Sequence, residues 1–485
     1  MKGKSKDIHI LISVILFVVM RIILGKCTGM GITPAGASAL SLFISTIYLW
    51  ITYGSGWTSL ISIALLAFTG ICPSSTVLAN SFGNSTTVIC IGTLALSVAL
   101  EETGVTTHIS NWFITRKFVN NRPYVFMLMF FLAEMVVTYV IEATAAMIVF
   151  VALAKSLLES LGYTKEDKFS KSIYLGVLWL VCAAMAATPI GHPVTILMLN
   201  TLSAVTGSPV SWLKYMAVGI PFSLVTLAIV MLIIRFVIRP DCEKFKAYDT
   251  EEIRKTMQPL SKRGKVVSAV YLVLIIVWLL PDFIGSVLPK VGEVLSSVGT
   301  AIPSLIAFAV LGAIRVDGEP ALDYEKTLKK LHWPTIWFIA CIFVYASIFS
   351  LESGGINVFL KNLVSPLTEK LSMTAMVVVF LALVALVTNF ASNGVTGIMG
   401  MTVCAPVLLT MTGSSVGIVT AFGVLATILC NFGIATPGGS GFVAIGQKDG
   451  YITAGETFKY GMLAVTLFYL SVIAVFWPLA KTIFA

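Results

Sequence analysis

The stretch Val384–Val407, VALVTNFASNGVTGIMGMTVCAPV, is apolar at both ends and interrupted by Thr388-Asn389 and by Ser392-Asn393-Gly394. Unwound backbone deep in a membrane is tolerated only where it lines a cavity or is buried in protein. We therefore interpret the stretch as the tip of a re-entrant hairpin. A half-helix from Val395 onward would turn its free N–H groups and positive dipole end toward a polar point suited to an anion. The alternative is a helix whose small residues allow close packing against a neighbour.

The composition places this stretch in a helical membrane protein. Of the 485 residues, 57% are hydrophobic and 11% are charged, and long apolar runs recur along nearly the whole chain. This pattern is typical of an all-α polytopic membrane protein. The first run, Ile8–Gly25, is longer than a usual signal-peptide core and is followed by further apolar segments, so we predict an uncleaved first helix. The eight scattered cysteines contain no C-x-x-C pair, which argues against a zinc site or a disulfide framework.

The basic residues predict orientation rather than a polyanionic partner. The formal net charge is +9. With the N-terminus placed in the cytoplasm, about 25 of the 32 Lys and Arg residues fall on the cytoplasmic side, which is the positive-inside bias. No basic patch is left for nucleic acid. We expect a multi-pass protein of the plasma membrane with a cytoplasmic N-terminus.

Apolar segments divide the chain into two similar halves on either side of a charged linker at 239–265. In the first half, spanning helices are predicted at about 8–25, 35–53, 56–72 and 85–103, a polar connection at 73–84, an interfacial helix at 107–121, a hairpin at 123–161, a broken helix at 169–204 and a further helix at 211–238. In the second half, helices are predicted at about 266–289, 296–314 and 335–351, an amphipathic segment at 356–370, a hairpin at 372–411, a broken helix at 416–446 and a last helix at 459–485.

Motifs in the first half recur in the second at nearly constant spacing. Thr138 and Glu142-Ala143-Thr144 lie 250 positions before Thr388 and Ser392-Asn393-Gly394, and Ala187-Thr188-Pro189 lies 248 before Ala435-Thr436-Pro437. By the crossing count the two hairpins enter from opposite sides. We therefore predict an inverted-repeat ion-transporter fold with about 11 transmembrane helices, two re-entrant hairpins and two broken helices. Residues 1–84 and 211–333 would form scaffold helices, 85–210 and 334–458 the transport elements, and 459–485 the last helix.

The polar groups at the second hairpin and break suit an anion and a hard cation. Hydroxyls and amides at Ser392, Asn393 and Thr436 would hold an anion that must be released again, more weakly than an arginine clamp. Carbonyls freed near Ala391 and Ala435 are oxygen ligands suited to sodium. For each residue taken alone, the alternative is helix packing or capping.

On these motifs the chain resembles the divalent anion/sodium symporters, the INDY-type dicarboxylate transporters, whose members carry Ser-Asn-Thr at both hairpin tips and a Thr-Pro type break in two discontinuous helices. The resemblance covers essentially the whole chain. It implies a homodimer that moves a small carboxylate by an elevator mechanism with sodium as coupling ion and no other cofactor. It implies substrate contacts at Ser392, Asn393, Gly394, Thr436 and Pro437, and in the first repeat at Glu142, Ala143, Thr144, Thr188 and Pro189. It implies a second sodium site at Thr388, Ala391, Asn393 and Ala435, and a first cation site at Thr138, Glu142 and Ala187.

The first repeat departs from the family pattern because a carboxylate replaces the amide. A register anchored on Thr144-Ala145-Ala146-Met147 would instead place the motif at Val140-Ile141-Glu142. An ionised carboxylate at mid-membrane is costly unless paired. Glu142 could ligate a cation, carry a coupling proton, or form a salt bridge, with His192 as the nearest partner by motif; otherwise it is neutral or reaches the interface. If ionised and uncompensated, it would favour a monoanionic or zwitterionic substrate.

We therefore expect a secondary active carrier of a di- or tricarboxylate or a related organic anion, with sodium coupling favoured over proton coupling. The alternatives are a sodium-independent anion exchanger, and a channel or a proton-coupled carrier or antiporter. An enzyme is disfavoured because no metal-ligand cluster, nucleophile–base pair or phosphate loop is present in the sequence. Glu102 and Glu352 recur at predicted helix ends, where a structural role is expected.

Overall fold

A computed structural model gives the arrangement of the chain and describes residues 2–256, 259–285, 287–349, 351–356, 358–359, 362–363, 371–411 and 415–484. Within them, β-structure is limited to the antiparallel pair β1 (Arg315–Val316) and β2 (Glu319–Pro320). Most of the predicted amphipathic segment 356–370 lies outside the described residues.

Helices account for nearly all of the remaining structure. The first half contains α1 (Lys2–Gly25), α2 (Pro34–Tyr53), α3 (Gly56–Leu66), α4 (Ser74–Ser81), α5 (Ser85–Glu102), α6 (Val105–Ile114), α7 (Pro123–Thr138), α8 (Ala143–Ser160), α9 (Lys168–Met185), α10 (Pro193–Thr206) and α11 (Trp212–Leu232). The middle contains α12 (Thr250–Thr256), α13 (Lys262–Gly285), α14 (Pro289–Val298), α15 (Ala301–Ala313), α16 (Tyr324–Lys330) and α17 (Trp333–Phe349). The last part contains α19 (Met373–Val387), α20 (Asn393–Met399), α21 (Ala405–Met411), α22 (Val416–Cys430), α23 (Gly441–Gln447), α24 (Ala454–Ser471) and α25 (Trp477–Phe484).

Short 3-10 and π-helical segments join or extend these helices. They are η1 (Thr28–Met30), η2 (Lys117–Val119), η3 (Ile233–Ile238), η4 (Glu243–Ala247), η5 (Glu352–Gly354), η6 (Gly400–Cys404) and η7 (Val472–Phe476). Turns η3, η6 and η7 are π-helical and continue α11, α20 and α24. Because η6 joins α20 to α21, residues Asn393–Met411 form one apolar helix of 19 residues.

The apolar lengths confirm an all-α membrane protein. Among the described residues, nine helices are long and apolar enough to cross a membrane, or ten if the pair α16 and α17, bent by 70°, forms one span. This is slightly below the predicted number of about 11, because α7, α10, α15, α19 and α22 are apolar but shorter. Helix α1 packs along α2 and turns a row of exposed apolar side chains outward, as a lipid-facing helix does.

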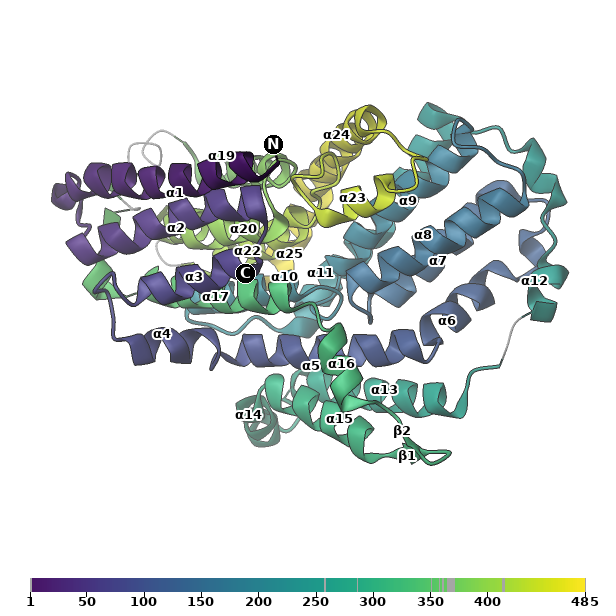
Figure 1. The fold of residues 1–485 in the computed structure, drawn as a ribbon, viewed down its shortest axis with the longest axis horizontal. Helices are drawn as coiled ribbons and strands as arrows, with labels where there is room; N and C mark the ends of the chain where they lie inside the picture. Colours follow the sequence, from purple (N-terminus) through teal and green to yellow (C-terminus); the bar gives the residue numbers. More distant parts are fainter. Residues whose placement is uncertain are drawn as a thin grey trace.

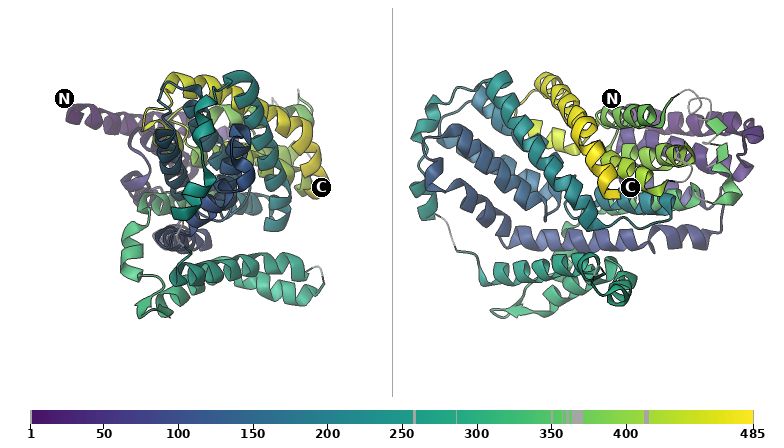
Figure 2. Two further views of the ribbon diagram at one scale, coloured as in Figure 1. Left: turned by 90° about the vertical axis from the view of Figure 1, so that its right-hand side faces the viewer. Right: turned by 180° about the vertical axis from the view of Figure 1, so that it is seen from behind.

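The two hairpins lie on opposite sides of the molecule's centre. Figure 1 shows α7 and α8 extending from the centre toward one end, whereas α19 and α20 lie on the other side of the centre. Helices α13, α14 and α15 form a layer next to α5, which is seen along one side of the molecule in both views of Figure 2. Helix α9 is the core of the first repeat: every residue in it except Lys168 and Lys171 is buried. This arrangement confirms the predicted pair of hairpins.

Each interruption of a hairpin or helix is explained by local sequence. The first hairpin breaks between Thr138 and Ala143, and the first broken helix between Met185 and Pro193, where proline occupies the first turn of α10. The second hairpin breaks between Val387 and Asn393, and the second broken helix between Cys430 and Gly441. The half-helix of the second hairpin begins at Asn393, two residues before the predicted Val395, because the carbonyl of Ser392 already accepts the Thr396 N–H at 2.9 Å.

Four boundaries differ from the sequence predictions. The predicted polar connection 73–84 is mostly the helix α4, in which the Ser81 hydroxyl donates to the carbonyl of Leu78 at 3.1 Å. The helix predicted at 56–72 ends at Leu66. The helix predicted at 296–314 is preceded by a separate α14 and begins after Gly299, which has a φ of +68°. The linker 239–265 contains η4, α12 and the start of α13.

Candidate functional site

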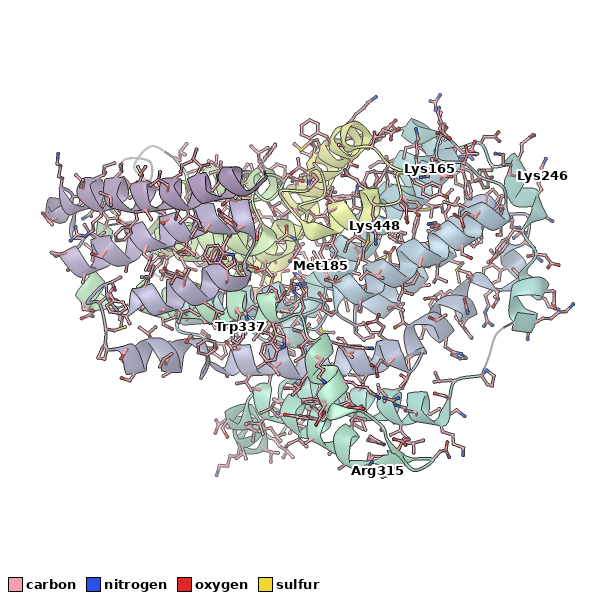
Figure 3. The ribbon with its side chains drawn as sticks, in the orientation of Figure 1. Lys165, Met185, Lys246, Arg315, Trp337 and Lys448 are labelled. Carbon is pink, nitrogen blue, oxygen red and sulfur yellow. The ribbon has the colours of Figure 1, made fainter. Side chains whose placement is uncertain are left out.

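A cavity of about 580 Å³ lies where both hairpin tips and both helix breaks meet. The first repeat contributes Thr144, His192 and Val194, and the second contributes Ser392, Asn393, Gly394 and the run Pro437–Phe442. The opposite wall is formed by residues of α2 and α17 and of the loops that follow α2 and precede α17: Trp50, Ile51, Gly54, Ser55, His332, Thr335 and Phe338. In Figure 3, Met185 at the end of α9 and Trp337 on α17 lie near the middle of the molecule, while Lys246 and Arg315 lie at its rim. The volume suits a small organic ligand.

In each repeat, an equivalent hydrogen bond joins the hairpin tip to the break in the discontinuous helix. Thr188 in the first break donates its hydroxyl to the carbonyl of Tyr139 at 2.8 Å. Thr436 in the second break donates to the carbonyl of Asn389, which lies 250 positions after Tyr139. Both threonine hydroxyls therefore point at their own hairpin tip. The repeated bond supports the twofold relation between the halves.

Two glycines allow the same close approach in each repeat. A β-carbon added to Gly191 would lie 2.6 Å from the carbonyl oxygen of Thr138, and one added to Gly439 would lie 2.5 Å from that of Thr388. Only a residue without a side chain fits at such distances. The carbonyl of Gly191 also accepts the N–H of Ala143 at 3.0 Å. Tip and break are thus packed backbone to backbone.

At the second tip, Ser392 is the N-cap of α20, yet its hydroxyl makes no capping bond. The N–H groups of the first helical turn consequently remain without a side-chain cap, beside a cavity lined by Ser392, Asn393 and Gly394. Pro437 and Gly438 line the same cavity, whereas Thr436 turns its hydroxyl away from it. Such a helix end attracts an anion.

Behind this tip, oxygen atoms gather around the side chain of Asn393. Its amide group lies 2.9 Å from the hydroxyl of Thr388 and 3.1 Å from the carbonyls of both Cys430 and Gly439, and with the nitrogen on this side it donates to all three. Hard oxygen donors of this kind suit a small cation. Of the predicted second sodium site, Thr388 and Asn393 thus lie together, while the N–H of Ala435 is bonded to Asn389 and the N–H of Ala391 to Val387.

At the first tip, Glu142 is the N-cap of α8 and uses its own carboxylate to cap the helix. The carboxylate accepts the Thr144 N–H at 2.9 Å, the Ala145 N–H at 3.4 Å and the Thr144 hydroxyl at 3.0 Å. The Nδ1 atom of His192 lies 3.5 Å from the same carboxylate. The pairing with His192 that the motif predicted is therefore present, at an ion-pair distance and longer than a hydrogen bond.

The N-caps also bear on the two registers open for the first motif. Glu142 and Ser392 occupy the same N-cap position at their tips. This equivalence favours the 250-residue register over the alternative at Val140-Ile141-Glu142.

The residues predicted for a first cation site serve three separate contacts. Thr138 donates its hydroxyl to the carbonyl of Glu134 in its own helix, Glu142 caps α8, and the carbonyl of Ala187 packs against Gly219 of α11. No hydrogen bond joins the three among the residues that the structure describes. Pro189 is buried within the break, behind the tip.

Sequence reasoning missed the residues on the opposite wall and one residue at the second tip. His332 lies in the bend between α16 and α17, and its Nδ1 is 2.7 Å from the hydroxyl of Thr335. It lines both this cavity and a smaller one of about 230 Å³ that also contains Glu142, His192 and Lys330. Asn389, known from sequence only as part of an interruption, accepts two N–H groups of the second break. In the sequence, Pro334 directly after His332 and Trp333 indicates a helix start, and nothing in this pattern indicates a binding site.

Glu102, expected to have a structural role, is bonded to Lys330 at 2.7 Å and to Arg263 at 3.4 Å. These bonds connect the end of α5 to α13 and α16. The equivalent residue Glu352 lies in η5.

Comparison with known proteins identifies the family. A model of the sodium:sulfate symporter transmembrane region matches residues 7–482. The chain belongs to this family. A solved structure shares the fold: the Alcanivorax borkumensis YdaH transporter, described as having an unusual topology, superposes with a TM-score of 0.54 at 14% identity, over 84% of this chain and 87% of that one.

Two relatives of this protein are named as sodium-dependent dicarboxylate transporters, SdcS. That of Staphylococcus saprophyticus is 24% identical over 398 residues, which cover 78% of this chain and 74% of the relative. That of Staphylococcus aureus strain COL is 24% identical over 306 residues, 61% of this chain and 56% of the relative. The matched region thus spans just over half of the S. aureus protein. Family membership and the apolar helices identify an integral membrane transporter.

Proposed function

We propose that the protein is a secondary active carrier that moves a small di- or tricarboxylate across the plasma membrane together with sodium. The observation that carries this proposal is the cavity in which the uncapped N-terminus of α20 faces the first repeat. A substrate carboxylate would accept hydrogen bonds from the first-turn N–H groups of α20 and from Ser392. The relatives named as dicarboxylate transporters support this substrate class.

The coupling ion is proposed to bind at the oxygen cluster behind the second tip. Thr388, Asn393 and the backbone carbonyls around them would hold Na⁺, with the amide oxygen of Asn393 turned toward the ion; Ala391 and Ala435 are proposed as its remaining ligands. Because Asn393 also lines the cavity, an ion here would fix the orientation of the tip to which the anion binds. Substrate and ion binding would then be coupled through one side chain.

The movement is proposed to be an elevator motion within a homodimer whose N-termini are cytoplasmic. The cavity supports this motion, because the two tips form one wall, and part of the other wall (Trp50, Ile51, Gly54 and Ser55) lies in the proposed scaffold segment 1–84. Residues 85–210 and 334–458 would move as the transport elements against scaffold helices in 1–84 and 211–333, with 459–485 as the last helix.

Uptake of labelled succinate into proteoliposomes tests this function. An inward sodium gradient should drive accumulation, and replacement of sodium by potassium should stop it. Asn393→Ala should abolish uptake while expression is retained, because it removes a ligand of both anion and ion. The matched control is Asn200→Ala, another amide in a separate cavity, and it should retain uptake. Accumulation without sodium, driven by internal succinate or by a proton gradient, would instead show an exchanger or a proton-coupled carrier.

A further inference from the structure

We infer that His192 is the second anchor of the substrate, a donor that contacts its other carboxylate, and that Glu142 is the positioning residue that orients the imidazole. This inference rests on the proposed function and deepens it. In the family pattern an amide at the first tip contacts the substrate. Here His192 of the broken helix takes that role.

The geometry of the pair leaves one ring nitrogen for a ligand. The side chains of His192 and Glu142 are 13% and 14% exposed, and 3.5 Å separates Nδ1 from the carboxylate. Nδ1 is buried and makes no hydrogen bond in the structure. Because His192 also lines the cavity, its Nε2 atom is the ring nitrogen that remains for a bound substrate. An Nδ1 that faces a carboxylate and an Nε2 that is available to a ligand is a common division of roles in an oriented histidine.

The first tip differs from the second in already holding an anion of its own. The carboxylate of Glu142 occupies the N–H groups of Thr144 and Ala145 at the start of α8. The corresponding end of α20 carries no such cap. A dicarboxylate spanning the cavity can therefore place one carboxylate on α20 but cannot place the other on α8. It needs a different donor on the side of the first repeat.

The charge of Glu142 does not exclude a dianionic substrate, because neighbouring groups compensate the charge of the carboxylate. Two N–H groups, one hydroxyl and the imidazole surround the carboxylate. With a protonated imidazole, the pair of Glu142 and His192 carries no net charge. The repulsion expected of an uncompensated Glu142, and the preference for a monoanion that followed from it, therefore do not apply to the paired state.

The other charged groups near His192 are less suited to the task. Glu101 at the end of α5 and Lys330 of α16 line the smaller adjoining cavity, and His332 lines both cavities from the opposite wall. Lys330 is bonded to Glu102 at 2.7 Å, and His332 contacts the hydroxyl of Thr335 at 2.7 Å. The ring of Phe442, 6.0 Å away from that of His192 between centroids, brings no charge. Among the described first-repeat residues that line the cavity, Thr144 already donates its hydroxyl to Glu142 and Val194 is apolar, so His192 is the remaining side-chain donor.

Competition between two acids of equal length tests the inference. Succinate and butyrate both have four carbons, but only succinate has a second carboxylate. Each acid is tested as an unlabelled competitor of labelled succinate uptake. His192→Gln should raise the succinate concentration needed for half-inhibition about 10-fold or more, as expected for the loss of a charge-assisted hydrogen bond. The concentration of butyrate needed should change less than about 2-fold. Glu142→Gln should lower the preference for succinate in the same direction, since the glutamine oxygen can still cap α8 while the charge is gone.

The matched control is His108→Gln, which removes a histidine of α6 that does not line the cavity. It should keep the wild-type ratio of succinate to butyrate. If His192→Gln weakens both acids equally, or leaves succinate unchanged, His192 is not the second anchor. If a variant is too slow for uptake, the thermal stabilisation of the purified protein by each acid gives the same ratio.

The outcomes also separate this inference from the proposed function. If wild-type protein neither transports nor binds succinate, the proposed function fails. If wild-type protein transports succinate, Asn393→Ala does not, and His192→Gln keeps the preference for succinate, only the role of His192 fails.

Discussion

The side-chain amide oxygen of Asn389 accepts a hydrogen bond from the backbone N–H of Ala435 at 2.9 Å, and a second from that of Ile434 at 3.0 Å. Its amide nitrogen donates to the carbonyl of Ala385 at 2.8 Å. All three contacts are buried, so a single side chain fastens the second helix break to the second hairpin. The equivalent position in the first repeat is Tyr139, whose hydroxyl lies 2.7 Å from Ser223 instead. The two repeats therefore share the bond from the break threonine to the backbone of the tip but differ in the side-chain chemistry at this position.

Asn389→Ala should destabilise the protein strongly. Two buried N–H groups would lose their acceptor, and each such loss costs about 1–3 kcal/mol. The apparent melting temperature of the purified protein should fall well below that of the wild type, and uptake should be lost with it. Asn200→Ala, which removes a half-buried amide with one bond to Thr86, is the control and should cost much less. Equal melting temperatures for the two variants would contradict a fastening role for Asn389.

The breaks that build the site are visible in the sequence because polar residues, glycine and proline interrupt apolar runs. Ser392-Asn393-Gly394 and Pro437 stand out for this reason, and both line the cavity. The partner of Glu142 could also be predicted, because His192 lies in the corresponding motif of the first break.

The opposite wall of the cavity could not be predicted from the sequence. Trp50, His332 and Phe338 lie in segments whose patterns are those of an ordinary apolar helix or a helix start, and they reach the site only through tertiary packing. Helix α4 was missed for a related reason. A short segment rich in Ser and Thr is typical of a connection, because these side chains compete with the helix by bonding to nearby backbone groups.

The ion pair of Asp167 and Lys244 predicts a small, pH-dependent contribution to stability. The Lys244 ammonium, 2.8 Å away, and the N–H of Thr164 hold the pKa of the Asp167 carboxyl below its usual range. A carboxyl whose pKa is lowered by folding stabilises the protein above its unfolded pKa of about 3.9, and this contribution is lost as the pH falls through the lowered value. Asp167→Asn should therefore reduce stability at neutral pH by at most about 1 kcal/mol, since the pair is partly exposed.

The difference between Asp167→Asn and wild type should shrink as melting temperatures are measured toward pH 3, below the unfolded pKa of about 3.9. Glu251→Gln is a suitable control, because Glu251 pairs with Lys117 at 3.6 Å on the surface and the pair is more exposed. A difference that grows at low pH would contradict the sign derived from the lowered pKa.

Gly394 and Phe338 should behave as a complementary pair, which explains why glycine stands where the family pattern has threonine. A β-carbon added to Gly394 would lie 2.5 Å from Cε1 of Phe338, too close for any real contact. The ring cannot move aside easily, because it is buried and packs edge to face on Trp50, with 4.8 Å between ring centroids. Gly394→Ala should therefore displace the second tip and sharply reduce succinate uptake.

The double variant Gly394→Ala with Phe338→Ala should recover part of that uptake, since the smaller side chain leaves space for the new methyl group. Gly455→Ala, at a position where an added β-carbon meets no atom within 4 Å, should leave uptake unchanged and serves as the control for a glycine replacement. A double variant no more active than Gly394→Ala would show that the two residues act independently. Uptake of Gly394→Ala at the wild-type rate would show that the tip tolerates a side chain and that the ring does not limit it.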